Sequence, residues 1–232
     1  MTFAEKILAF NQALTIDRSL LPEGIEVMNP FGDKNVLQIT QTFYGKYFND
    51  NELRFMILGI NPGRFGGGVT GIPFTDPHKL KDYCGIQLQE LSSAELSADF
   101  VYKVINQYGG PEKFYKKFFV TAVSPLGFLK EKNAKRINYN YYDSLELQDA
   151  LKDFILDSIT KQLTFGIHRS VCFCLGTGKN FEYLTKLNNT HQFFKTIIPL
   201  SHPRFVMQYR RKKIDLFVDE YLQAFKLAET RI

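Results

Sequence analysis

Cysteine is scarce in this sequence of 232 residues: three occur, two of them in Cys172-Phe-Cys174. Three cysteines cannot make a disulfide framework, so we expect them to be packing residues in a reducing compartment. No stretch approaches the roughly 20 apolar residues of a membrane span, and the first residues lack the basic start and apolar run of a secretory signal. These absences exclude a disulfide-rich fold and predict a cytoplasmic protein without a membrane segment.

Charge and apolar content are what the sequence does have. Hydrophobic residues make up 44% of the chain, enough to form the core of one domain. The net charge is +5, and the segment from His202 to Lys213 holds five Lys or Arg residues and no acid. Such a cluster is either a solvated helix start or a phosphate-binding patch, and its own sequence leaves both open.

Short apolar runs alternate with amphipathic segments, which is typical of a parallel sheet flanked by helices. The runs predict strands at 54–60, 117–123, 170–175 and 195–199. Helices are predicted from the capping box at Thr2 to about Leu14 and then over 35–48, 98–108, 144–163 and 179–187. The clearest helix is the last, with an apolar face made by Ile214, Phe217, Val218, Tyr221, Leu222 and Phe225. We predict a single three-layer α/β/α domain over residues 1–232, with a central, mainly parallel four-stranded sheet.

Unusual residues follow three of these predicted strands. They are Asn61-Pro62-Gly63, Ser124-Pro125-Leu126 and Ser201-His202-Pro203. Because the carboxyl ends of parallel strands meet at one edge of a sheet, where ligands bind, we expect the three exits to surround one cleft.

The first exit opens a glycine-rich segment. Of the 16 glycines in the chain, six lie within Leu58–Phe74, a density that lets backbone approach a ligand closely. The segment contains neither the P-loop nor the dinucleotide-binding pattern. Gly176-Thr-Gly178-Lys179 lacks the leading glycine and the Ser or Thr of a P-loop, so it does not predict a phosphate site.

The glycine-rich segment resembles a known family motif. Gly59-Ile-Asn61-Pro62-Gly63-Arg-Phe65-Gly66, followed by Thr70-Gly71-Ile-Pro73-Phe74, is similar to the first motif of the single-strand-selective monofunctional (SMUG) branch of the uracil-DNA glycosylase superfamily. That motif reads Gly-Met-Asn-Pro-Gly-Pro-Phe-Gly, then Thr-Gly-Val-Pro-Phe at the same spacing. His202-Pro203 stands where the second family motif begins. The likeness is strong over residues 58–86, moderate around 118–126 and 199–204, and weak elsewhere, as in a divergent, bacterial-type member.

The resemblance implies a monofunctional DNA glycosylase that hydrolyses the N-glycosidic bond of uracil, leaves an abasic site and so begins base-excision repair. It places Asn61 as the amide that positions the attacking water, and His202 as the donor to the 2-oxo group of the departing base. Taken alone, Asn61 would be a turn or helix-cap residue, and a lone histidine after a strand is more often structural.

The same resemblance implies a base pocket. Phe74 would be the aromatic floor on which the flipped base stacks, although any one of 22 phenylalanines could be a core residue. Phe65 would shape the wall and offer its backbone amide. The other expected base-binding residues are Gly59, Ile60, Gly63, Gly67, Ala122 and Ser124.

One departure from the family concerns the base reader. The family carries His-Asn-His-Cys-Pro-Leu on the middle strand, where the asparagine reads uracil; here the stretch is Thr121-Ala122-Val123-Ser124-Pro125-Leu126. Ala122 has no polar side chain, so Ser124, Thr121 or the backbone reads the base, or discrimination is loose. Together with Gly67 in place of a bulkier methionine, this predicts excision of other deaminated bases besides uracil.

A second departure follows His202, where Arg204 and Phe205 replace the Ser-Pro of the family loop. Either side chain could fill the space that a flipped base leaves in the duplex. Which of the two is this inserted residue, or wedge, is not decided by the sequence. The expected DNA-binding residues are Pro203, Arg204, Phe205, Arg210, Arg211 and Lys212, with Lys213 beside them.

We expect DNA to be the partner and the protein to be a monomer without a cofactor. We also expect no bound metal, because His, Cys and Asp do not cluster at the spacing of metal ligands. No lysine lies in the matched motifs, which disfavours lyase chemistry. Two other functions remain open: a DNA-binding protein that keeps the fold without catalysis, and a nucleotide-metabolism enzyme that binds phosphate at the glycine-rich loop.

Overall fold

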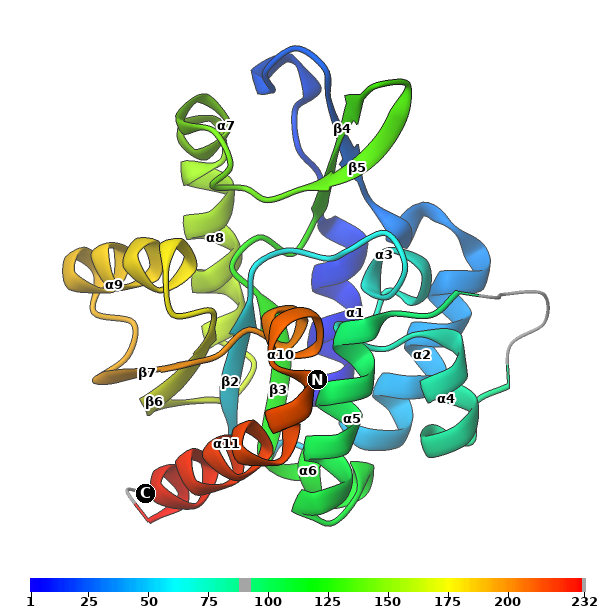
Figure 1. The fold of residues 1–232 in the computed structure, drawn as a ribbon, viewed down its shortest axis with the longest axis vertical. Coiled ribbons are helices and arrows are strands. Elements are labelled where there is room, and N and C mark those ends of the chain that lie inside the picture. The colour runs from blue at the N-terminus through cyan, green and yellow to red at the C-terminus, as the bar shows by residue number, and fades with distance from the viewer. Residues whose placement is uncertain (88–92, 231–232) are drawn as a thin grey trace.

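The computed structural model describes residues 1–87 and 93–230, and a four-stranded parallel sheet lies at its centre (Figure 1). The strands are β2 (Arg54–Gly59), β3 (Phe118–Ala122), β6 (Ile167–Leu175) and β7 (Thr196–Leu200), in the order β3-β2-β6-β7. All neighbouring pairs are parallel, which confirms the predicted sheet. Pro199 is accommodated because β7 is an edge strand, where a missing N–H breaks no ladder.

Helices cover both faces of this sheet. Side chains alternate between the two faces along each strand, and every residue of β2 and β3 is buried, so both faces need a covering layer. Ile57 and Val120 face a layer made by α5 (Leu96–Tyr108), α6 (Pro111–Lys117) and α11 (Ile214–Glu229). Phe119 and Thr121 face the opposite layer, made by α1 (Phe3–Ala13), α2 (Lys34–Tyr47) and α8 (Lys152–Leu163). The three-layer α/β/α arrangement is therefore confirmed.

The remaining helices are shorter or lie at the margins. They are α3 (Gly67–Thr70), α4 (Pro77–Cys84), α7 (Leu145–Ala150), α9 (Lys179–His191) and α10 (Pro203–Tyr209), with 3-10 turns at Arg18–Leu20, Pro30–Gly32 and Arg211–Lys213. The predicted helix over 144–163 is corrected to two, α7 and α8, because Leu151 has a ψ of −2° and interrupts the regular hydrogen bonding. The three cysteines are free and buried, as expected. Within the described ranges, no helix is long and apolar enough to cross a membrane.

A second sheet was not predicted. It consists of β1 (Ile25–Met28), β4 (Gly127–Lys132) and β5 (Lys135–Tyr139), paired antiparallel in the order β1-β4-β5. The β4–β5 hairpin is largely exposed and rich in Lys, Arg and Glu, so it lacks the apolar runs by which the buried strands were recognised. Its base continues from β3, which brings Tyr139 and the residues after it close to the exit of β2.

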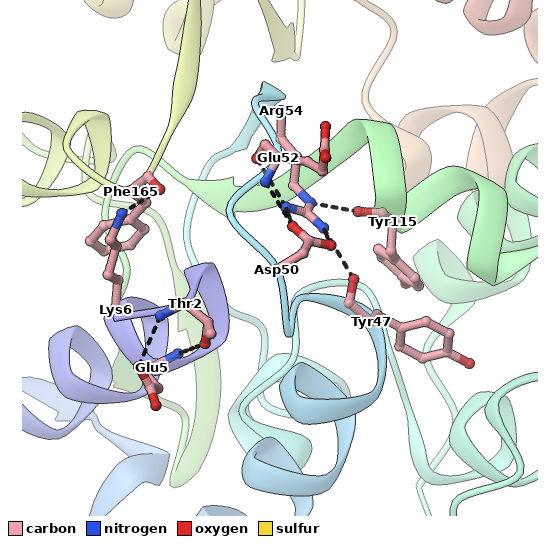
Figure 2. A network of polar contacts seen from close by, with 9 residues as sticks. All are labelled: Thr2, Glu5, Lys6, Tyr47, Asp50, Glu52, Arg54, Tyr115 and Phe165. Carbon is pink, nitrogen blue, oxygen red and sulfur yellow. Dashed lines mark hydrogen bonds and ion pairs between the residues drawn. The ribbon is translucent and has the colours of Figure 1, made fainter.

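A buried arginine anchors the amino end of β2. The side chain of Arg54 is fully buried, and its guanidinium forms two hydrogen bonds with the Asp50 carboxylate, at 2.8 and 2.9 Å. It also donates to the carbonyl oxygens of Tyr115, Glu52 and Tyr47 (Figure 2). Arg54 therefore joins β2 to the ends of α2 and α6. The hydrogen bonds from Arg54 lower the pKa of the Asp50 carboxyl.

We predict that Arg54→Leu lowers the free energy of unfolding by about 3–5 kcal/mol, because it leaves carbonyl oxygens and a carboxylate without their donor. It also removes the guanidinium from between the rings of Phe3 and Phe48, each 4.7 Å away. Urea denaturation measures the change. The exposed Arg18→Leu is the matched control, with an expected change within about 0.5 kcal/mol; equal losses for both variants would contradict this account.

Candidate active site

A pocket lies at the carboxyl ends of β2 and β3, where the sequence predicted a cleft. Most of the residues expected to bind the base line it, together with Asn61. The lining residues are Gly59, Ile60, Asn61, Pro62, Gly63, Gly67, Pro73, Phe74, Glu95, Thr121 and Ala122. The parallel register explains the meeting of the two strands, because Gly59 of β2 pairs with Ala122 of β3.

The Asn61 side chain is held by backbone groups at the end of the hairpin. Its Nδ2 donates to the Tyr139 carbonyl oxygen at 3.2 Å, and its Oδ1 accepts from the Tyr141 amide at 3.1 Å. Because one partner can only accept and the other can only donate, the orientation of the amide is fixed. Among the described residues Tyr141 is the one donor to Oδ1, so the second lone pair of this oxygen can accept a hydrogen bond from water.

Tyr141 is itself anchored deep in the protein. Its ring is fully buried, and its hydroxyl donates to Oδ1 of Asn180 on α9 at 2.8 Å. Asn180 in turn donates to the carbonyl oxygen of Leu175 at the end of β6. Asn180, which directly follows the Gly176–Lys179 segment, therefore helps to position the backbone that holds Asn61.

Phe74 lines the pocket, and its backbone is in a strained conformation. Its φ is +53°, a left-handed backbone that a bulky aromatic residue rarely adopts. This conformation lays the ring against the backbone of Gly59, where a Cβ would come 3.1 Å from the ring. Strain of this kind is often found at functional sites, where the surroundings hold it in place.

His202 lies beside Phe74, with 5.8 Å between the two ring centroids. It is the N-cap of α10, and its Nδ1 accepts a hydrogen bond from the Arg204 amide at 3.1 Å. An Nδ1 that accepts carries no proton, so the neutral ring is protonated on Nε2 and can donate from there. Burial, and then the charge of Arg204, lower the pKa of His202 to about 4.

Phe74 links Asn61 and His202, which lie far apart in the sequence. Asn61 and Phe74 line the same pocket, and the Phe74 ring packs beside His202. The structure therefore brings together the predicted amide, aromatic floor and imidazole.

Two expected base-binding residues lie elsewhere. Phe65 is 48% exposed, and its ring lies beneath the Arg64 guanidinium at 4.5 Å rather than on the pocket wall. Ser124 is fully buried, and its hydroxyl donates to the Leu126 carbonyl oxygen at 2.9 Å. Ser124 follows β3, and its amide bonds to the Ile60 carbonyl oxygen, which draws the chain behind the pocket.

The pocket also contains a carboxyl group that the sequence did not predict. Glu95 stands at the N-cap of α5, and its backbone amide donates to the Asp76 carboxylate at 3.0 Å. Burial and then the charge of Asp76 raise the pKa of Glu95 to about 7, against a lowering influence of Arg204. A glutamate before an amphipathic helix reads as an ordinary helix start, so no sequence signal marked it.

Beside His202, α10 presents the expected DNA-binding residues. Arg204, Phe205, Arg210, Arg211 and Lys212 are all exposed, whereas Pro203 is buried and serves as the first residue of the helix. Phe205 packs against Tyr209, at 5.7 Å between ring centroids, and lies beneath the Arg210 guanidinium. This exposed cluster, Arg204 to Lys212, is a cationic and aromatic surface next to the pocket, suited to phosphates and bases.

Over residues 1–87 and 93–230, no three His, Cys, Asp or Glu side chains gather closely enough to hold a metal ion.

Comparison with known proteins identifies the family of the chain. Residues 46–226 match the family described as the Uracil DNA glycosylase superfamily. The crystal structure of wild-type SMUG2 from Pedobacter heparinus is 49% identical, with a TM-score of 0.96 and 99% of each chain covered. No curated protein matches the chain.

We predict that His202 stays neutral, with its proton on Nε2, at all pH values from about 8 down to about 5, because the Arg204 amide occupies Nδ1. Long-range proton–nitrogen NMR spectra of the imidazole measure both tautomer and titration. Since the folded pKa lies below the ordinary value, stability is lost as the pH falls from the ordinary His pKa toward about 4. A titration midpoint at the ordinary value, or a proton on Nδ1, would contradict the structure.

Proposed function

Because the chain belongs to the uracil DNA glycosylase superfamily and resembles its SMUG branch, we propose that it hydrolyses the N-glycosidic bond of uracil in DNA. The product is an abasic site, the starting point of base-excision repair. The observation that carries this proposal is that Asn61 and Phe74 line one pocket and that the Phe74 ring packs beside His202.

In this proposal the target nucleotide leaves the stack and its base enters the pocket. Flipping a base costs a few kcal/mol, and stacking on an aromatic ring such as Phe74 returns about 1–3 kcal/mol. The strained backbone of Phe74 keeps the ring in place before the base arrives, so less ordering is needed on binding.

Bond cleavage then separates charge. The electron pair of the C1′–N bond moves onto the uracil ring, and the sugar becomes positively charged at C1′. The Nε2 proton of His202 donates to the negative 2-oxo group. A water held by the free lone pair of Asn61 Oδ1 adds to C1′, and its proton leaves through solvent to the released base. The neutral His202 is suited to this role because a donor that is already in place needs no reorganisation.

The reaction proposed is hydrolysis without a lyase step, because a Schiff base requires an amine and no lysine is among the described residues that line the pocket. We further propose that the cluster from Arg204 to Lys212 grips the DNA backbone, with Arg204 or Phe205 as the wedge. The protein would act as a monomer in the cytoplasm, on DNA, with neither metal nor cofactor.

A catalytically inactive DNA-binding protein is the second candidate, favoured by Ala122 and by the altered loop after His202. An inert binder, however, has no use for an amide fixed at both ends or for a donor tautomer of histidine. A nucleotide-metabolism enzyme is a weaker candidate, since it would act on free nucleotides.

We predict that the protein excises uracil from an oligonucleotide, and that Asn61→Ala abolishes excision while DNA binding is retained. His202→Ala should lower the single-turnover rate about 100- to 1,000-fold, the usual loss for one oxyanion donor. Alkaline cleavage of abasic products measures excision, and fluorescence anisotropy measures binding.

The exposed Lys186→Ala on α9 is the control and should leave excision unchanged. Binding without strand breaks in the wild-type protein would favour the inactive binder, and turnover of free nucleotides would favour the third candidate. Full activity in Asn61→Ala would contradict the role given to the amide.

A further prediction concerns base spectrum. Because Ala122 lines the pocket without a polar side chain, we expect excision of hypoxanthine and xanthine besides uracil. Parallel assays on oligonucleotides that carry each base measure the relative rates. Strict specificity for uracil would contradict this expectation.

A further inference from the structure

The side chains that could read a base in this pocket are already bound elsewhere, with one exception. The Thr121 hydroxyl donates to Gln162 at 2.7 Å, and the Ser124 hydroxyl donates to Leu126. The Asn61 amide is held by the hairpin backbone. Ala122 has no polar side chain. Among the described residues that line the pocket, Glu95 is the remaining side chain that can both donate and accept hydrogen bonds.

The Glu95 carboxyl is placed inward and lacks a partner. Its Oε2 is buried, and no group in the described ranges forms a hydrogen bond with it. The carboxyl lies against the glycine-rich loop: a Cβ on Gly66 would overlap Oε2, and a Cβ on Gly63 would come 3.5 Å from Oε1. Burying a polar group without a partner is unfavourable. Because Glu95 lines the pocket and its carboxyl has an oxygen without a partner, the carboxyl points to a ligand that completes its hydrogen bonding.

We propose that Glu95 is the base-reading residue, and that its carboxyl pairs with the adjacent C=O and N–H groups of the base. This inference rests on the proposed function and names what that site recognises. Uracil, hypoxanthine and xanthine each carry this lactam edge, whereas adenine and cytosine do not. Glu95 would therefore recognise bases with a lactam edge, and the size and shape of the pocket would have to exclude guanine and thymine.

Pairing with a lactam requires the carboxyl in its neutral form, as an O–H donor beside a C=O acceptor. The groups that face Glu95 act on it in opposite directions. Burial and the charge of Asp76 raise the pKa of its carboxyl to about 7, and Arg204 opposes them. DNA phosphates close to Arg204 would weaken that opposition and favour the neutral form further.

A neutral carboxyl reads less strictly than an amide. Its proton can sit on either oxygen, so the donor and the acceptor can exchange places, whereas the two ends of an amide are fixed. Such a reader accepts the lactam in either order along the base edge, which suits pyrimidines and purines alike. Glutamate at this place thus substitutes for the asparagine that the middle strand lacks.

The test compares Glu95→Gln and Glu95→Ala in single-turnover excision from oligonucleotides that carry uracil or hypoxanthine. Glu95→Ala should lower the rate on both bases about 10- to 100-fold, the usual loss for hydrogen bonds to a buried polar group. As the pH rises above the raised pKa of Glu95, about 7, the wild-type rate should fall and level off at the rate of Glu95→Ala, because only the neutral carboxyl reads the base. Glu95→Gln keeps a donor and an acceptor at every pH, so it should be active without this decline.

Glu112→Gln, on the exposed start of α6, is the matched control and should keep the wild-type pH profile. A thermal melt adds a readout for folding. The raised pKa of Glu95 means that stability is lost as the pH rises through about 7, so Glu95→Gln should melt higher than wild type at about pH 8 and not at about pH 5.

An unchanged rate in Glu95→Ala, or a wild-type pH profile in Glu95→Gln, would overturn the inference while leaving the proposed function intact. If the wild-type protein excises no base, the proposed function fails. In that case the inference is tested by binding: the affinity for an oligonucleotide with non-cleavable 2′-fluoro-deoxyuridine is compared with the affinity for one with adenine at the same position. A preference that Glu95→Ala removes would support base reading, and the absence of any preference would overturn it.

Discussion

The paired hydrogen bonds that hold the Asn61 side chain are the constraint on which the site depends. If only one end of the amide were hydrogen-bonded, the side chain could rotate and present either its oxygen or its nitrogen to the pocket. The Tyr139 carbonyl oxygen accepts from Nδ2 and the Tyr141 amide donates to Oδ1, so the side chain has a single orientation. That orientation relies on the buried contact between Tyr141 and Asn180. The orientation of Asn61 at the exit of β2 thus depends on contacts with the hairpin, α9 and the central sheet.

The second requirement is electrical neutrality where negative charge will form. His202 is neutral because its Nδ1 caps α10 and burial disfavours the imidazolium. Glu95 is held near its titration point by burial and by Asp76. The positive charges gather instead on the exposed cluster from Arg204 to Lys212, where phosphates would lie. The exposed positive charges are therefore separate from the pocket, as the proposed binding of DNA backbone and base requires.

The sequence predicted the central sheet well, because each of its strands is a short apolar run between turn signals. The convergence of strand exits predicted that the segments after the strands would lie near one another, and the family resemblance added Phe74, which lines the pocket with Asn61 and packs beside His202. The hairpin escaped prediction because its exposed strands are rich in charge and resemble a loop. Glu95 and Tyr141 could not be found this way either: their importance comes from burial and from partners distant in sequence, which no local pattern records.

In the proposed reaction, one flipped uracil lies between Asn61 and His202. A crystal structure of the protein bound to a single-stranded oligonucleotide with 2′-fluoro-deoxyuridine would show where the base binds. The account predicts the base stacked on Phe74, the 2-oxo group within hydrogen-bond reach of His202 Nε2, and a water between Asn61 Oδ1 and C1′. A uracil bound at another place, or a pocket still closed by side chains with the DNA in position, would contradict it.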